Sequence, residues 1–409
     1  MENQWKNLLI MLNNLVHPEK KIELVQPVDW SRLINLARRH KVMPLVIELA
    51  CEYSDFVDSD YGKVCVADAV SLTANQISKT AAFVDIYRKM SEDGITPIVM
   101  KGVICSELYG DYSDHRLSGD EDILIKKTDF NRVDEFLKNN GFNADFDNVT
   151  ELQIRKIQEV TYTCDELNLR LEVHLNPLGT ENDLRLKMNE WFDDCFENCR
   201  DFKVNGVTLK TFNHTDHCLF LIFHAAKHFT FGGFGIRQVL DILLYIEKYH
   251  SEIDFDYVKK ALESVSAYLL YNDILCIGNE YLGFETFKPE LKNCPEELLE
   301  DLMECGIYGD GTQAQRTAAQ MVSAAVGRRR YSAKFGKAGL IFDTVFPDRR
   351  QFMSVCPEIE EKPWLIVREN SKRIARFISH RKANNNHLVV ESTDIGIKRI
   401  KLLQKYGLI

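Results

Sequence analysis

Apolar residues recur at helical spacing through most of the chain, and they alternate as in strands only in its central part. In residues 1–93 they form three helical stripes, the last of which ends at Gly94, a glycine in a C-terminal capping position. Short apolar runs at 95–100, 123–125, 160–163 and 167–175 predict strands. Helical spacing returns after residue 211. The pattern therefore predicts an α+β protein with an N-terminal helical region (1–93), a strand-rich core (94–210) and a C-terminal helical domain (211–409).

Finer elements follow from the same pattern. We expect an acidic helix over 186–199, one short strand over 204–209 and a loop over 334–339. The runs at 160–163 and 167–175 flank a polar segment and predict a hairpin. The N-terminal stripes are interpreted as core packing, and no residue in them points to chemistry.

Two aspartates stand at the head of the apolar run 123–125. Asp120 and Asp122 are separated by one residue, so in a strand both side chains lie on one face and Glu121 lies on the other. Like charges this close repel each other, and a divalent cation is a natural reason to keep them together. A turn-forming acidic cluster at the strand entrance is the alternative, but it explains the alternating pair less well. The pair is the leading candidate for a metal site.

Residues on either side of a predicted short helix at 103–109 are candidates for binding an anion. Lys101 and Gly102 follow the strand at 95–100, and backbone N–H groups at a helix start favour phosphate, especially where glycine allows close approach. A glycine after a strand is also a common turn. Arg116 precedes the aspartates and either pairs with carboxylates or bridges to a bound triphosphate; both interpretations stay open.

The strand at 167–175 carries one internal carboxylate. Glu172 and His174 face the same way, opposite to the leucines and Val173. Because acidic side chains are rarely buried without a partner, Glu172 is a candidate third carboxylate of the metal site. The alternative is an edge strand whose polar face meets water.

A strongly apolar segment at 217–229 contains three histidines on one helix face, His217, His224 and His228. Histidines at i, i+4 bind zinc in some helical sites, but the usual glutamate between them is absent, and packed histidines are the more common case. Arg237 and Asp241 share a face of the next helix, where they form either a structural pair or a contact with substrate.

Composition excludes several classes of protein. The chain has 409 residues and a net charge of -10, which argues against a broad nucleic-acid-coating surface. The basic run Arg328-Arg329-Arg330 with Lys334 and Lys337 is the one local candidate, so nucleic acid is an unfavoured partner that stays open. Eleven cysteines without a CxxC pair are typical of reduced thiols. No apolar run approaches membrane-spanning length, and a cytoplasmic protein is expected.

The order and spacing of these motifs resemble one family. The segments are ITPIVMKG, LYGD, Arg116, GDEDILI, a strand ending in EVH, and HAAKH followed by RQVLDILL, with FPDRRQFMSVCPE and PWLIVREN further on. Together they are similar to the uncharacterised bacterial nucleotidyltransferase family of the polymerase-β-like superfamily, over residues from about 30 to 380.

The resemblance implies a small mixed sheet flanked by helices and metal-dependent transfer of a nucleoside monophosphate from an NTP, with ATP as the expected donor, to an unknown hydroxyl acceptor. Mg²⁺ is the implied ion, with Mn²⁺ as its substitute. By position, Asp120, Asp122 and Glu172 match the metal-binding and catalytic carboxylates. Lys101 and Gly102 match the phosphate-side turn, and Arg116 is placed with the nucleotide. His174, His224, His228, Arg237 and Asp241 are candidates for the substrate side.

The chain departs from the family pattern at three places, and the first two departures motivate a second hypothesis. The commoner Gly-Ser pair is Lys101-Gly102 here, Glu121 replaces an apolar residue, and Glu172 replaces the commoner aspartate. The second hypothesis is a non-catalytic nucleotide-binding or partner-binding protein that keeps the fold. A third is a helical metal hydrolase built on His224, His228 and Asp241.

Overall fold

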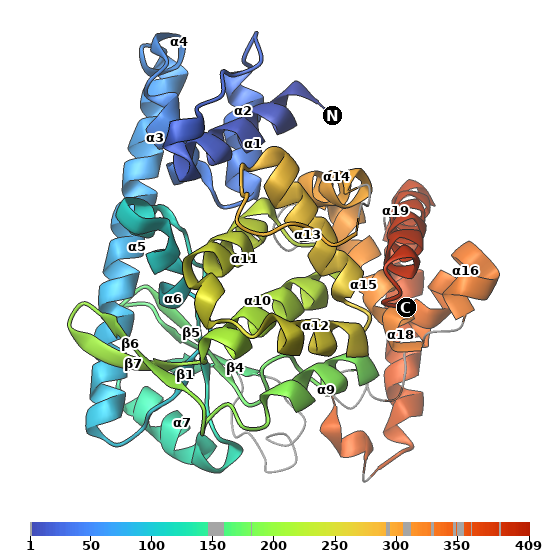
Figure 1. Ribbon diagram of the computed structural model, residues 1–409. Coiled ribbons are helices and arrows are strands. Elements are labelled where there is room, and N and C mark those ends of the chain that lie inside the picture. Colours follow the sequence, from blue (N-terminus) through green and yellow to red (C-terminus); the bar gives the residue numbers. More distant parts are fainter. Residues whose placement is uncertain are drawn as a thin grey trace.

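The computed structural model describes residues 2–145, 159–180, 182–291, 295–305, 312–328, 331–346, 349, 356–360, 362–383 and 386–409. In these residues the chain is α+β, with one mixed sheet flanked by helices, as the sequence predicts (Figure 1). No helix in the described ranges combines the length and the apolar character that a membrane crossing needs.

The N-terminal part is helical. Its elements are α1 (Asn3–Val16), the 3-10 turn η1 (Pro18–Lys20), α2 (Trp30–Arg39), α3 (Met43–Ala50), α4 (Ser54–Val57) and α5 (Asp60–Glu92). The side chain of Ser59 caps α5 by accepting a hydrogen bond from the Gly62 N–H at 2.9 Å. Figure 1 shows α5 as one long helix that runs from the N-terminal helices to the sheet. The helix therefore links the N-terminal region to the core.

The sheet has the strand order β3-β4-β5-β2-β1-β7-β6. Its strands are β1 (Ile98–Val99), β2 (Glu121–Leu124), β3 (Asn143–Ala144), β4 (Glu159–Cys164), β5 (Leu169–His174), β6 (Arg200–Val204) and β7 (Val207–Thr211). β2 pairs with β5 and β1 with β7 in parallel, and the other neighbours are antiparallel. The predicted hairpin at 160–175 is confirmed as β4 and β5.

The helices around the sheet come from the core and from the C-terminal part. Between the strands lie α6 (Val103–Ser106), η2 (Glu107–His115), η3 (Lys127–Asp129), α7 (Phe130–Asn139), α9 (Asp183–Asn189) and η4 (Glu190–Phe192). The C-terminal part contains α10 (His214–Phe229), α11 (Ile236–Tyr249), η5 (His250–Glu252), α12 (Phe255–Ser264), α13 (Tyr268–Tyr281), α14 (Glu296–Cys305), α15 (Gln313–Arg328), α16 (Tyr331–Val345), η7 (Pro357–Ile359), α18 (Leu365–Ala383) and α19 (Asn386–Lys405).

Alternation along the strands divides the buried residues between two cores. Ile123 of β2 and Val173 of β5 face α7 and the C-terminal half of α5. Leu124 lies on the opposite face and joins a larger cluster that holds both the N-terminal helices and α10–α13. The N-terminal and C-terminal helices therefore share one core above one sheet face. The division at residues 93 and 210 stays a prediction.

Three local expectations were wrong. The acidic helix ends at Asn189, and 3-10 and turn structure follow; the Asn and Asp side chains in this segment compete for backbone hydrogen bonds and disfavour a helix interior. The expected strand at 204–209 is two strands, because Asn205 and Gly206, with φ of 48° and 79°, form the tight turn of the β6–β7 hairpin. The expected loop at 334–339 lies in α16, and only Gly336, with φ of 55°, departs from helical geometry.

The basic run of α15 and α16 is only partly described. Arg329 and Arg330 lie outside the described residues, as do the side chains of Arg328 and Lys334. Lys337 is exposed and lies within ion-pair distance of Asp394. The nucleic-acid interpretation of this run stays a prediction.

His40 joins the N-terminal helices to the C-terminal part and makes folding depend on pH. It is fully buried, its Nδ1 accepts a hydrogen bond from the Ile236 N–H at 3.2 Å, and burial lowers its pKa from 6.5 to about 3. Below pH 6.5 the unfolded chain binds a proton that the folded chain does not, so stability falls as the pH falls toward 3. We expect His40 to remove about 2 kcal/mol of unfolding free energy between pH 7.5 and pH 5.

Urea unfolding of the wild type and of His40→Gln at these two pH values checks this expectation. The variant should lose about 2 kcal/mol less than the wild type over the same interval. His250→Gln, at an exposed histidine, is the control and should keep the wild-type dependence. An unchanged slope in His40→Gln would contradict the prediction.

Candidate active site

A polar cleft of about 410 Å³ opens where β2 and β5 meet α10 and the turn between α2 and α3. It is rich in charged and imidazole side chains. Its described lining residues are Lys41, Lys101, Gly119, Asp120, Asp122, Glu159, Arg170, Glu172, His174, His224, Lys227 and His228. Seven of the eleven residues predicted at the site line this cleft, namely Lys101, Asp120, Asp122, Glu172, His174, His224 and His228.

The strand register brings the predicted carboxylates together. β2 and β5 are parallel neighbours, and Asp122 is the direct partner of Glu172. Partners in adjacent strands project side chains to the same face, so both carboxylates point into the cleft. Asp120 immediately precedes β2 and lines the same cleft. Asp122 and Glu172 are 50 positions apart in the sequence, and the parallel pairing of their strands brings them together.

Asp122 is held by a histidine and faces a lysine. The Nε2 atom of His174 lies 2.9 Å from one carboxylate oxygen of Asp122, and the Lys101 Nζ lies 3.1 Å from the other. The His174 Nδ1 lies 3.4 Å from Glu159, and Arg170 donates to Glu172 at 3.1 Å. These contacts fix the orientation of both carboxylates.

Burial and charge set the protonation of these groups. Burial acts to raise the pKa of Asp122, but the Lys101 ammonium and His174 outweigh it and hold the pKa well below its usual range. Burial, followed by the charges of Asp122 and Asp120, raises the pKa of Glu172 to about 8. Burial acts to lower the pKa of His174, and Glu159 and Asp122 reverse this effect and raise it. The carboxylates of Glu172, Asp122 and Asp120 therefore repel one another in the cleft, and a bound cation would offset this repulsion.

One group of side chains has the geometry of a metal site. Ligand atoms of Asp122, Glu172 and His174 lie within 4.8 Å of one another. Among the described residues, this is the one group of three His, Cys, Asp or Glu side chains with ligand atoms that close together. The predicted set was Asp120, Asp122 and Glu172. The structure adds His174, through its position two residues after Glu172 on the same face of β5, while Asp120 lines the cleft outside this group.

The turn at Lys101 and Gly102 is occupied by Glu121. Its carboxylate accepts a hydrogen bond from the Val103 N–H at 3.0 Å, at the start of α6. A Cβ atom added to Gly102, whose φ is 64°, would lie 1.9 Å from this carboxylate. Glu121 is buried, and burial raises its pKa to about 8. The prediction that Gly102 contacts a nucleotide stays a prediction, and its contact in the structure is Glu121.

Arg116 and Asp241 form a buried pair with each other. The guanidinium donates from Nε and Nη2 to the two oxygens of Asp241, at 2.8 and 2.7 Å, and from Nη1 to the Gly102 carbonyl at 3.3 Å. The Tyr109 hydroxyl also donates to Asp241, at 2.9 Å. Of the two interpretations of Arg237 and Asp241, the structural pair is therefore wrong, because Arg237 donates to the Leu117 carbonyl instead. Of the two interpretations of Arg116, the geometry favours a carboxylate partner.

The three histidines of α10 have different environments. His217 is fully buried, stacks on Tyr245 with ring centroids 4.6 Å apart, and lies away from the cleft. His224 and His228 line the cleft, with Nε2 atoms 3.1 Å apart, and His224 Nε2 is 3.3 Å from the Lys101 Nζ. Burial, followed by nearby lysines, lowers the pKa of His224 and His228 well below 6.5. Within the described chain they form no metal group with Asp241, so the hydrolase hypothesis has no support.

Lys41 and Lys227 also line the cleft, and sequence reasoning missed both. Lys41 lies between α2 and α3, in the region interpreted only as core packing. Lys227 lies within the HAAKH segment, where the flanking histidines drew attention. No spacing rule marks an isolated lysine as part of a site, so only the tertiary structure reveals them.

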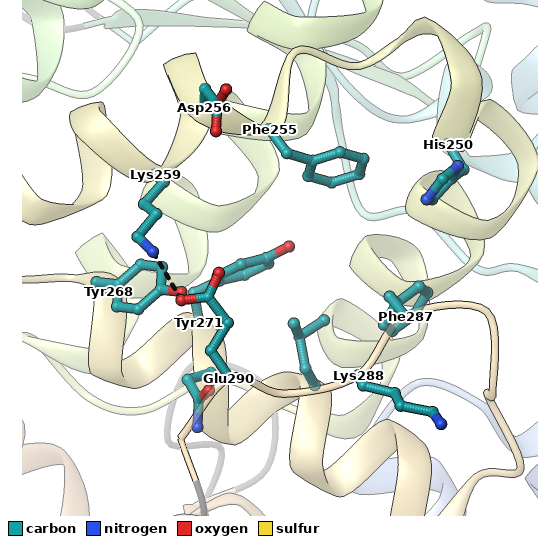
Figure 2. A pocket seen from close by; sticks show the side chains of 11 residues that line it. His250, Phe255, Asp256, Lys259, Tyr268, Tyr271, Phe287, Lys288 and Glu290 are labelled. Atoms are coloured by element: carbon teal, nitrogen blue, oxygen red, sulfur yellow. Dashed lines mark hydrogen bonds and ion pairs between the residues drawn. The ribbon is translucent and has the colours of Figure 1, made fainter.

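A second pocket, of about 250 Å³, lies between α12, α13 and the segment 287–290 (Figure 2). The rings of Phe255, Tyr271 and Phe287 line it, and Lys259 bonds Glu290 at 2.6 Å beside them. It shares no lining residue with the acidic cleft. The group with metal-site geometry and the paired carboxylates Asp122 and Glu172 belong to the cleft, which is therefore the candidate active site.

The fold and the cleft define an α+β protein with a buried Asp-Glu-His group of metal-site geometry on one face of a mixed sheet. Residues 26–283, well over half of the chain, match the family described as uncharacterised nucleotidyltransferase, and the protein belongs to this family. The match contains every cleft residue, whereas the FPDRRQFMSVCPE and PWLIVREN segments lie beyond it. The comparisons with curated proteins and with solved structures gave no match.

Proposed function

We propose that this protein transfers a nucleoside monophosphate from an NTP, with ATP as the expected donor, to a hydroxyl acceptor, and that the transfer depends on Mg²⁺ or Mn²⁺ bound in the cleft. The observation that carries the proposal is the parallel register of β2 and β5, which sets Asp122 beside Glu172 in the cleft of a nucleotidyltransferase-family protein.

The residues fit a divalent cation. Asp120, Asp122 and Glu172 offer carboxylate oxygens, the ligands that Mg²⁺ prefers. The raised pKa of Glu172, about 8, reflects burial and the repulsion of Asp122 and Asp120, which a dication would offset. When bound, the metal supplies charge stabilisation at the reacting phosphate.

The other cleft residues have positioning roles in this proposal. His174 orients Asp122 through the 2.9 Å contact, as partners of metal-binding carboxylates commonly do. Glu172, the strand partner of Asp122, accepts the proton of the acceptor hydroxyl. Lys101 offsets charge on the nucleotide. The nucleotide roles of Gly102 and Arg116, and the substrate roles of His224, His228, Arg237 and Asp241, remain predictions.

One observation favours the second candidate, a non-catalytic nucleotide-binding or partner-binding protein. Lys101 Nζ lies 3.1 Å from Asp122, so a side chain already supplies positive charge at the carboxylate. In that case the protein would bind an NTP without turning it over.

Pyrophosphate release separates the two candidates. The full chain would be incubated with each of the four NTPs, with Mg²⁺ or Mn²⁺, and with panels of sugar, aminocyclitol, peptide and nucleic-acid hydroxyl acceptors. Label from an α-³²P NTP should appear on an acceptor together with pyrophosphate. NTP binding with no pyrophosphate release across all panels would favour the non-catalytic candidate.

A further inference from the structure

We infer that Lys41 and Lys227 bind the polyphosphate chain of the nucleotide. Lys41 comes from the N-terminal helical region and Lys227 from the C-terminal one, and together they form a subsite beside the carboxylates of the cleft. This inference rests on the proposed function, because it names the residues that hold the NTP in the same cleft. Both lysines line that cleft together with Asp120 and Asp122.

The backbone at Lys41 is the first observation. α2 ends in a turn in which the Lys41 N–H bonds the Arg38 carbonyl and the Val42 N–H bonds the Ala37 carbonyl. Such turns favour glycine at the left-handed position, and Lys41 occupies it with φ of 53°. A residue with a side chain is strained there, by about 1–2 kcal/mol. Strained residues that persist often have a functional side chain.

The side chain of Lys41 reaches the loop that leads to the aspartates. A Cβ atom added to Gly119 would lie 3.2 Å from the Lys41 Nζ, so the ammonium packs against the residue directly before Asp120. His40, the neighbour of Lys41, is anchored by the Ile236 N–H at 3.2 Å. The left-handed turn and this anchor together hold the ammonium at the cleft.

Lys227 reaches the cleft from the C-terminal part. It lies in the last turn of α10, is half-buried, and belongs to the cleft wall together with His224 and His228. Its positive charge contributes to the lowered pKa of both histidines, so the imidazoles are neutral near pH 7. Lys227 is therefore the cationic side chain that α10 contributes to this wall.

The turn at Lys101 and Gly102 offers less room for phosphate. A helix start binds phosphate through its backbone N–H groups and through the space that a glycine leaves beside them. Here Glu121 takes up both, because it accepts a hydrogen bond from the Val103 N–H and fills the space beside the Gly102 Cα. Because Glu121 takes up this turn, side chains elsewhere in the cleft are better placed for phosphate, and lysine ammonium groups are suitable point charges for a polyphosphate.

Equilibrium binding tests the inference. Calorimetric titrations would measure a non-hydrolysable NTP analogue with Mg²⁺, inorganic tripolyphosphate and the corresponding NMP against the full chain. We expect Lys41→Met and Lys227→Met each to weaken binding of the analogue and of tripolyphosphate about tenfold, and the double variant about 100-fold. NMP binding should change less than about twofold, and Lys41→Arg/Lys227→Arg should retain most of the affinity.

The matched control is Lys63→Met/Lys260→Met, which removes one exposed lysine from each helical region away from the cleft. If the double cleft variant binds the analogue as tightly as this control, or loses NMP affinity equally, the inference is wrong while the proposed function survives. If tripolyphosphate binding depends on the two lysines but no acceptor is ever labelled, the subsite stands and the proposed transfer does not. A wild type that binds neither ligand would overturn both.

Discussion

Asp122→Asn is expected to reduce nucleotidyl transfer by at least about 10³-fold. Asp122 is a buried member of the metal-type group and the direct strand partner of Glu172, so the variant removes one negative charge from the cation site while keeping the side-chain volume. A metal supplies several kcal/mol of charge stabilisation, and each 1.36 kcal/mol corresponds to a tenfold change in rate. Pyrophosphate release measures the rate, and Mn²⁺ binding followed by electron paramagnetic resonance measures the site directly.

Two further variants make this result interpretable. Glu172→Gln should show the same joint loss of Mn²⁺ affinity and rate, although the Glu172 side chain has a different set of contacts. Asp165→Asn, at an exposed aspartate in the turn of the same β4–β5 hairpin, should leave both unchanged. If both cleft variants are folded by circular dichroism and still bind Mn²⁺ with wild-type affinity, the assignment of the metal site is wrong.

Arg116→Met is expected to lower the free energy of unfolding by about 3–5 kcal/mol. The guanidinium and the Asp241 carboxylate are 3% and 5% exposed, and removing one partner leaves the other charge buried and unpaired. Urea unfolding measures the change. Arg116→Met/Asp241→Leu should cost less than the two single substitutions together, because it leaves no buried charge without its partner.

The exposed ion pair between Arg38 and Asp68 provides the control. Its side chains are 40% and 48% exposed, so Arg38→Met should change the unfolding free energy by less than about 1 kcal/mol. If Arg116→Met keeps wild-type stability but has a raised KM for the NTP, the structural role is wrong and Arg116 is a nucleotide ligand instead.

Much of the local structure could be predicted, because it depends on neighbours in the chain. Period-two alternation sends Ile123 and Leu124 to different cores, and the carboxylates that it picked out, Asp122 and Glu172, both line the cleft. The errors were also local. The signal at Asn205-Gly206 was present in the sequence and was missed, since the apolar residues around it were interpreted as one strand instead of a hairpin.

What the sequence determined by itself is an α+β chain with an acidic pair at a strand head and a matching glutamate about fifty residues later. Strand periodicity and short-range spacing decide these features. Only the tertiary structure decided which groups surround them: Asp241 pairs with Arg116 across 125 residues, Glu121 fills the space beside Gly102, and Lys41 reaches the cleft from the N-terminal helices. Each of these contacts depends on how separate elements pack, and a pairing between distant side chains leaves no periodic pattern in the chain.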